Sequence, residues 1–452
     1  MSIKESRPHR ADQNTVQRRP RLIVRPKRYE DVAAILAKPK SFPSPVRAVG
    51  ADYSQTRCAT SDAGTSMHTG ALDRILEFES ASVRVQAGVT MGTLVRTLAE
   101  RGLELPLTPE IGNMTVGAAA VSTLPQSSYQ DGLAQIASCV TELRLITPQG
   151  RQITVTERDR ELMRVLRSSH GLLGVVHEVV LRVQTMRAVK IDYRAYSLAE
   201  FAARFRRIVG APGALRFHVA PFSDRVTVER RVPDEEEAVT RSGIWQIRNS
   251  VMRNVLPAFG TSVGAVLATP GLRSAVLTGV HRALNATQGR GERGVVLHAH
   301  EWMRDLPAEA WKARHTYSLW AFPQGNFPEV LASYAAFSRA YYKQYRYRCN
   351  LVTTASRLHR DRSALFSPSY GGEMVTLEPS SPGEQGFEDF LIDFNDFASA
   401  QGGVPTFNQT RALTREHVAK AFGERARLFS ALRRRTDPLN RLRNSYFAQI
   451  LD

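Results

Sequence analysis

The chain has 452 residues, of which 42% are hydrophobic and 23% charged, an ordinary balance for a globular protein of two or three domains. It holds no run of about 18 apolar residues and begins with polar and basic residues, so neither a membrane-spanning helix nor a signal peptide is expected. The three cysteines, Cys58, Cys139 and Cys349, have neither metal-binding nor disulfide spacing, which favours a reducing cytoplasm and no metal site.

The formal net charge of +18 predicts attraction to an anionic partner. An arginine-rich, solvated surface is the alternative explanation. The sequence contains no zinc-finger spacing and no RNA-binding aromatic signature, so nucleic acid is not an expected partner.

The first half of the chain predicts short strands and two helices after a flexible basic tail at residues 1–20. The expected helices are Tyr29–Ala37 and Met91–Arg101, the second ending at Gly102. Strands are expected at Arg21–Val24, Val46–Gly50, Ala71–Phe78, Val83–Ala87, Val140–Ile146 and Gln152–Thr156, with a pair of strands in Leu172–Val183. A turn at Pro148–Gly150 predicts that the strands on either side form a hairpin.

The second half predicts strands at Leu215–Val219, Arg225–Val228 and Gly294–Ala299, and helices at Phe327–Tyr345 and Glu416–Arg435. Residues 234–293 are predicted to be an insertion of helices in which arginines alternate with apolar residues. Such helices can lie on an anionic membrane surface, so peripheral membrane contact is one interpretation. A helical cap packed on its own domain is the other.

The most informative stretch is residues 109–123. Gly, Ala or Ser fills five of the seven positions from Gly117 to Thr123. So few side chains would let the backbone approach a large flat ligand such as a dinucleotide. The alternative is a small-residue helix packed in a core.

Two further small-residue elements, Val49–Ser54 and Gly171–Val176, flank this stretch in the sequence. No Gly-x-Gly-x-x-Gly motif follows the first strand, so a Rossmann cofactor site is not expected.

These elements resemble the vanillyl-alcohol oxidase/p-cresol methylhydroxylase (PCMH) flavoproteins. The motifs that carry the resemblance are Arg47–Gly50, Val83–Val89, Thr115–Ala118 and Gly174–Glu178. The second half is similar to the alditol and sugar-lactone oxidase branch, at Asn350–Arg357, Phe366–Tyr370, Gly402–Phe407 and Asp437–Phe447.

The resemblance implies an α+β fold: a two-part, PCMH-type FAD-binding domain with an inserted antiparallel-sheet substrate domain. Residues 21–187 would form the FAD-binding part, and residues 188–404 the substrate domain. Residues 405–452 would return to the flavin site.

It also implies which residues bind the cofactor. Relatives carry a histidine that bonds covalently to the flavin where this chain has Tyr53, so the FAD is predicted to be bound non-covalently. The implied cofactor-binding residues are Val49, Gly50, Ala51, Asp52, Tyr53, Ser54, Pro109, Thr115, Val116, Gly117, Ser122, Ser127, Val176 and Asn444.

The implied catalytic residues are Arg357, Gln409, Glu378 and Tyr370. Arg357 could hold a substrate oxygen, and Glu378 could accept a proton if burial raises its pKa. Relatives have a lysine near the flavin where this chain has Gln409, so a neutral hydrogen bond would replace a cation.

The expected function is an FAD-dependent oxidase or dehydrogenase that acts on a CH–OH group. It would transfer a hydride from an alcohol- or lactone-like small molecule to the flavin, and then to oxygen or another acceptor. The predicted insertion suggests a substrate larger or more apolar than a sugar. The alternative is a flavin-binding scaffold, or a subunit of a complex, without oxidase activity.

Overall fold

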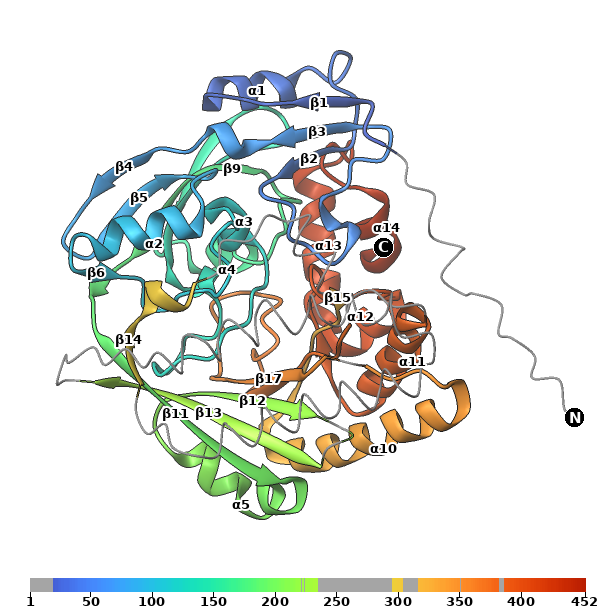
Figure 1. Cartoon of the computed structure of the whole chain (residues 1–452). Helices are drawn as coiled ribbons and strands as arrows, with labels where there is room; N and C mark the ends of the chain where they lie inside the picture. Colours follow the sequence, from blue (N-terminus) through green and yellow to red (C-terminus); the bar gives the residue numbers. More distant parts are fainter. Residues whose placement is uncertain are drawn as a thin grey trace, which may run out of the picture.

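A computed structural model describes residues 19–220, 222, 224–234, 295–303, 316–349, 351–381 and 386–452. Nearly all of the predicted tail at 1–20 and of the insertion at 234–293 lies outside these residues, as does the membrane contact predicted for the insertion. Figure 1 shows the N-terminal strands and helices at one end of the molecule and a large sheet at the other, with C-terminal helices beside both.

The N-terminal end begins with a three-stranded parallel sheet in the order β1-β3-β2. Its strands are β1 (Leu22–Val24), β2 (Val46–Val49) and β3 (Thr65–His68). Helix α1 (Tyr29–Ala37) has the predicted bounds, and its apolar residues form a core cluster with this sheet.

A five-stranded antiparallel sheet follows, in the order β4-β5-β9-β7-β8. Its strands are β4 (Ile75–Phe78), β5 (Ser82–Gln86), β7 (Val140–Ile146), β8 (Gln152–Thr156) and β9 (Val175–Arg182). The predicted hairpin is the β7–β8 pair. The strand pair predicted in Leu172–Val183 is wrong, because the chain turns at His170 and Gly171, which both have positive φ, and only β9 follows.

Three helices pack on this sheet or along its edges: α2 (Met91–Ala99), α3 (Val116–Val121) and α4 (Arg160–Leu166). Gly102 has a φ of +68° just beyond α2, a conformation that favours glycine, as predicted. Strand β6 (Leu103–Glu104) pairs with β10 (Gln184–Thr185).

The second region is an antiparallel sheet whose described strands have the order β14-β11-β13-β12-β17-β18-β16-β20. They are β11 (Ala188–Ser197), β12 (Ala214–Ala220), β13 (Arg225–Asp234), β14 (Val295–His298), β16 (Trp320–Pro323), β17 (Thr353–Leu358), β18 (Met374–Leu377) and β20 (Val404–Pro405). A short pair, β15 (Thr316–Tyr317) and β19 (Ser380–Ser381), lies beside it. The inserted antiparallel sheet is therefore confirmed.

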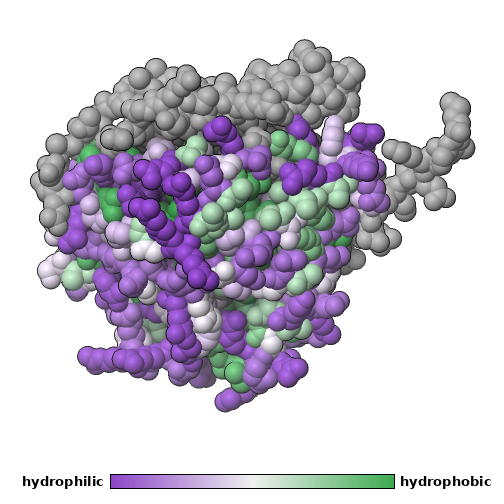
Figure 2. All heavy atoms as spheres, turned by 90° about the horizontal axis from the view of Figure 1, so that it is seen from below, coloured by the Kyte–Doolittle hydropathy of each residue, from purple (hydrophilic) through white to green (hydrophobic). Residues whose placement is uncertain are grey.

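Helices α5 (Leu198–Gly210), α10 (Phe327–Tyr345) and α11 (Phe387–Ala400) cover the outer face of this sheet. Because side chains alternate along a strand, Phe217 and Ala355 face these helices, while Arg216 and Ser356 face the N-terminal region. Seen from the helix side, Figure 2 shows mostly hydrophilic residues with hydrophobic ones interspersed.

The C-terminal part contains α12 (Arg415–Phe422), α13 (Glu424–Thr436) and α14 (Ser445–Leu451). The helical pattern predicted over Glu416–Arg435 is confirmed, as two helices that Gly423, with a φ of +49°, separates. Within the described residues, no helix combines the length and apolar character needed to cross a membrane.

The predicted domain boundaries remain predictions. The boundary after residue 187 coincides with the start of β11, whereas the boundary after residue 404 falls inside β20. Pro405 pairs with Trp320 of β16, so the C-terminal segment begins as part of the large sheet.

Three buried side chains tie the segment around residue 442 to the N-terminal sheet. Arg47 of β2 donates to Leu442 O at 2.9 Å and to Cys58 O at 2.9 Å. Arg441 donates to backbone carbonyls at the end of α1. Asn444 donates to the carbonyls of residues 57, 58 and 60. The C-terminal segment therefore completes the N-terminal region.

Replacing Arg47 with methionine should destabilise this junction. The change leaves buried carbonyls without a donor, and the free energy of unfolding should fall by about 3 kcal/mol. Arg158→Met, at an exposed site, is the matched control and should change it by less than about 0.5 kcal/mol. Urea unfolding of both variants measures the difference, and equal stabilities would contradict the assignment.

Candidate functional site

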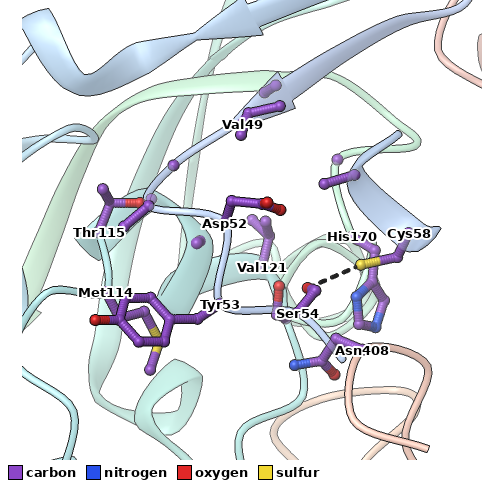
Figure 3. Close-up of a pocket in the computed structure, with 18 of the residues that line it drawn as sticks. Val49, Asp52, Tyr53, Ser54, Cys58, Met114, Thr115, Val121, His170 and Asn408 are labelled. Atoms are coloured by element: carbon purple, nitrogen blue, oxygen red, sulfur yellow. Dashed lines mark hydrogen bonds between the residues drawn. The ribbon is translucent and has the colours of Figure 1, made fainter. Parts of the chain in front are cut away.

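A deep cavity lies where the N-terminal sheets, α3 and the C-terminal segment meet (Figure 3). Its empty volume is about 1030 Å³, part of which opens to solvent. The lining comes from the loop after β2, from α3, from the turn before β9, and from two residues beyond β20. Its lining residues include Arg47, Cys58, Met114, Ala118, Val121, Leu124, His170, Gly171, Tyr317, Asn408 and Gln409.

Close backbone packing shapes the walls of this cavity. A Cβ atom on Gly50 would lie 2.1 Å from Oγ1 of Thr115, and one on Gly117 would lie 2.6 Å from Cβ of Ala87. Both positions therefore require glycine, which brings the loop after β2 against the start of α3. The small-residue run serves two purposes, since Ala119 and other α3 residues are buried in the core while Gly117 faces the cavity.

Two non-glycine residues of the lining have left-handed backbone conformations. Asp52 has a φ of +55°, and His170 has a φ of +50°, followed by Gly171 at +72°. Such conformations cost energy and are concentrated at ligand-binding positions.

Several buried polar atoms of the lining have no protein partner among the described residues. They include Oγ1 of Thr115, Oδ1 of Asn408 and both ring nitrogens of His170. Burial and the nearby charge of Arg47 lower the pKa of His170 to about 3, so its imidazole is neutral. Buried polar atoms normally have hydrogen-bond partners, so this cavity is built to surround a polar ligand or water.

The cavity has two different ends (Figure 3). Figure 3 draws Tyr53 and Met114 toward one end. At the other, Ser54, Cys58, His170 and Asn408 lie together, and Oγ of Ser54 is 3.1 Å from Sγ of Cys58.

The structure brings most of the predicted cofactor residues to this one cavity. Those that line it are Val49, Gly50, Ala51, Asp52, Tyr53, Ser54, Thr115, Gly117, Ser122 and Val176, together with Gln409 from the predicted catalytic set.

Four predicted cofactor residues do not line it. Pro109 and Val116 are buried behind its wall. Ser127 accepts a hydrogen bond from Leu215 N and lines a different cavity. The amide of Asn444 is fully engaged with backbone groups, so this residue supports the loop that carries Cys58.

The lining residues that were not predicted as site residues include His170, Tyr317 and Asn408. Asn408 precedes the predicted residue Gln409, and His170 precedes the predicted element Gly171–Val176. Their position beside these residues was the sequence signal that could have identified them. Tyr317 lies in a two-residue strand and has no sequence signal of its own.

A second, smaller cavity lies between the N-terminal region and the inner face of the large sheet. Its empty volume is about 570 Å³. Polar residues make up much of its lining, beside an apolar wall that includes Leu105, Leu107 and Trp302. The polar lining residues are Thr108, Glu110, Gln126, Ser127, Ser128, Tyr129, Arg216, Arg231 and Ser356.

A chain of alternating charges follows one side of this second cavity. Arg216 and Arg231 both bond to Oε1 of Glu110, the latter at 3.1 Å. Arg231 also pairs with Glu229 at 2.6 Å, and His218 Nε2 lies 3.1 Å from Glu229. Each carboxylate and guanidinium side chain is at most 20% exposed. Arg231, His218 and Arg216 hold the pKa of Glu229 well below its usual range despite burial.

A smaller polar group links the two cavities. Gln409 Nε2 donates to the Tyr317 hydroxyl at 3.2 Å, and both residues line the first cavity. Burial and the charge of Glu378 raise the pKa of Tyr317, so its phenol stays protonated. Burial raises the pKa of Glu378, which Arg216 partly offsets. Glu378 therefore interacts electrostatically with one residue of each cavity.

Arg357 and Tyr370 lie elsewhere, in contrast to the expectation that they face the flavin. Arg357 donates to Val209 O at 2.7 Å and to Gly213 O at 3.0 Å, on the helix-covered face of the sheet. The alternation along β17 turns Ser356, not Arg357, inward. The Tyr370 hydroxyl accepts a hydrogen bond from Arg164 at 3.2 Å, and Tyr370 lines neither cavity.

The model of a family described as FAD binding domain matches residues 20–156 of this chain. The chain carries a PCMH-type FAD-binding domain. The matched segment contains the loop after β2 and α3, which form much of the first cavity. The close glycine contacts and the buried polar atoms without protein partners fit FAD in that cavity.

The FAD-binding domain also has named relatives. The chain is 29% identical over 231 residues to an L-gulono-1,4-lactone dehydrogenase of Mycobacterium tuberculosis, covering 50% of this chain and 52% of the relative. It is 28% identical over 166 residues to the L-gulonolactone oxidase of Bos taurus, covering 36% and 37%. The match thus spans about half the length of such curated relatives or less, and the resemblance to the lactone oxidase branch is confirmed.

Solved structures show the same fold over nearly the whole chain. Cholesterol oxidase from Brevibacterium sterolicum superposes with a TM-score of 0.74 at 14% identity, covering 95% of this chain and 94% of that one. At this identity the likeness shows the fold alone. The predicted α+β, two-part fold with an inserted sheet is confirmed.

Gly117→Ala should damage the FAD-binding cavity. The added methyl group would contact Ala87, so overpacking should lower the free energy of unfolding by about 1–3 kcal/mol and weaken FAD binding by displacing α3. Gly70→Ala is the control, because no atom lies within 4 Å of the added Cβ. Thermal melting and FAD titration of both variants test this, and wild-type behaviour of Gly117→Ala would contradict it.

Proposed function

We propose that this protein is an FAD-dependent oxidoreductase that oxidises a CH–OH group of an alcohol- or lactone-like molecule and binds its flavin non-covalently. The observation that carries the proposal is the pair of adjoining cavities. One fits FAD, and the other offers polar groups on the inner face of the substrate-side sheet. The names of the relatives, which are lactone oxidases and dehydrogenases, support this choice of substrate class.

The residues that would hold FAD are those of the loop from Val49 to Ser54, together with Thr115, Gly117, Ser122 and Val176. When bound, the flavin supplies a hydride acceptor. Tyr53 lines the cavity where relatives carry the attachment histidine, and a phenol does not readily replace imidazole in that bond. This supports a non-covalent flavin.

The substrate would lie between Tyr317 and the charged face that carries Arg216. Segments 110–111 and 124–126 contribute neighbouring residues to both cavities, so the two spaces adjoin. The second cavity has hydroxyl, amide and guanidinium groups beside an apolar wall. Such a lining suits a hydroxyl-bearing ring better than the apolar substrate that the insertion first suggested.

Two residues have the properties needed to handle the substrate hydroxyl. Tyr317 stays protonated and receives a hydrogen bond from Gln409, which leaves its own O–H to hold a substrate oxygen. Glu378 is the proposed proton acceptor, because burial raises its pKa towards the range useful for general-base catalysis. Thr354 and Thr376 orient its carboxylate, with hydroxyl contacts of 3.3 Å and 3.4 Å.

The proposed compartment remains the reducing cytoplasm. None of the three cysteines forms a disulfide within the described residues, and all three are buried, which supports this proposal. The electron acceptor is proposed to be oxygen or another oxidant, as for oxidases and dehydrogenases generally.

The function is tested by flavin content and flavin reduction. The purified protein should be yellow, and acid denaturation should release its flavin into solution. A panel of sugar lactones, polyols and other alcohols should include one that bleaches the flavin rapidly without oxygen. A yellow protein that no member of the panel reduces would favour the scaffold function. Flavin retained on a peptide containing His170 or Cys58 would contradict non-covalent binding.

Glu378→Gln should remove the acidic limb of the pH profile. The base must be deprotonated, and burial raises its pKa, so wild-type kcat/KM should increase as pH rises through a pKa above that of free glutamate. Glutamine cannot accept the proton, so kcat should fall by about 10²–10⁴-fold and lose this pH dependence. An unchanged profile would exclude Glu378 as the proton acceptor.

A further inference from the structure

The second cavity contains an arginine pair of unusual arrangement. Arg216 comes from β12 and Arg231 from β13, and both guanidinium groups meet at one oxygen of Glu110. Glu110 belongs to the FAD-binding side, in the segment that follows β6. Two strands of the substrate-side sheet therefore hold a carboxylate that another region of the chain supplies.

We propose that Glu110 occupies a two-arginine carboxylate site and thereby sets the ligand preference of the second cavity, which accepts neutral hydroxylic molecules and rejects their carboxylate counterparts. This inference rests on the proposed function, since it takes the second cavity as the place of the substrate. It identifies Glu110 as a specificity-determining residue.

Charge balance is the first argument. Among the described residues, Arg216 and Arg231 form ion pairs with two carboxylates, Glu110 and Glu229, and all four side chains are largely buried. A third carboxylate, brought by a ligand, would add a buried negative charge that this group of four does not neutralise, which is costly. A neutral hydroxyl group can donate and accept hydrogen bonds there without changing the balance.

Preorganisation is the second argument. Arg231 is held from two sides, because Glu229 accepts from its Nε at 2.7 Å and its guanidinium lies 4.6 Å from the ring centre of Trp302. These contacts do not involve Glu110, so Arg231 should keep its position when the Glu110 charge is removed. A planar guanidinium that is already oriented binds carboxylate well.

Glu110→Gln therefore should leave this group of two arginines and two carboxylates with one uncompensated positive charge. The amide keeps the size of the side chain, and the two arginines lose their shared anion. An external carboxylate should then take the place of the Glu110 charge.

The experiment compares two probes of similar size with the flavin-loaded protein: sodium gluconate, a hydroxy acid, and sorbitol, a neutral polyol. Isothermal titration calorimetry gives each dissociation constant without requiring turnover. Wild-type protein should bind gluconate no more tightly than sorbitol. Glu110→Gln should bind gluconate about tenfold or more tightly than wild type does, with sorbitol affinity changed less than about threefold.

Glu142→Gln is the matched control. Glu142 also receives two arginines, Arg84 at 2.6 Å and Arg144 at 3.1 Å, and is 20% exposed, but it lines neither cavity. It should leave both affinities unchanged. The double variant Glu110→Gln/Arg216→Gln restores neutrality and should return gluconate affinity to the wild-type value.

Three results would overturn the inference: no gain of gluconate affinity in Glu110→Gln, the same gain in Glu142→Gln, or wild-type protein that prefers gluconate to sorbitol. The comparison of gluconate with sorbitol needs only wild-type protein, so it tests the inference even if Glu110→Gln fails to fold. Failure of the proposed function has a different signature, because a flavin that no substrate reduces leaves these binding constants measurable.

Discussion

The site depends on one constraint: the buried side chain of Arg47 needs hydrogen-bond acceptors. Arg47 is 3% exposed, and burial lowers its pKa to about 10, so the guanidinium remains charged near neutral pH. It finds acceptors in the carbonyls of Cys58, His170 and Leu442. These carbonyls belong to three separate segments, two of which line the FAD-binding cavity. One buried cation thus holds the cavity wall and the C-terminal segment together.

The inner face of the large sheet supplies the charged and polar side of the second cavity. Strand alternation separates a face packed with aromatic side chains from a face that presents Arg216, Glu229 and Ser356. The aromatic face secures the sheet to α5 and α10. The polar face therefore contacts the FAD-binding side through ion pairs. Substitutions on this face can change the chemistry of the cavity without altering the fold.

Local sequence patterns predicted the structural features that depend on residues close together in the sequence. Examples are α1, the β7–β8 hairpin and the glycine at the end of α2. Arg357 was misplaced because a shift of one residue along β17 reverses the face, and the sequence around it gives no alternation to set that register. The pairing of Glu110 with Arg216 could not be predicted, because it joins loop and strand more than 100 positions apart. The hydrogen bond between Gln409 and Tyr317 could not be predicted for the same reason, because it also joins residues far apart in the sequence.

The contact between Arg47 and Leu442 also has a consequence for biosynthesis. The two residues are 395 positions apart, so a ribosome must translate both regions of the fold before this contact can form. Until then the cavity lacks the wall that Asn408 and Gln409 provide, and the loop that carries Cys58 lacks the Asn444 amide that supports it. The cavity is therefore completed late in the synthesis of the chain, long after its N-terminal walls.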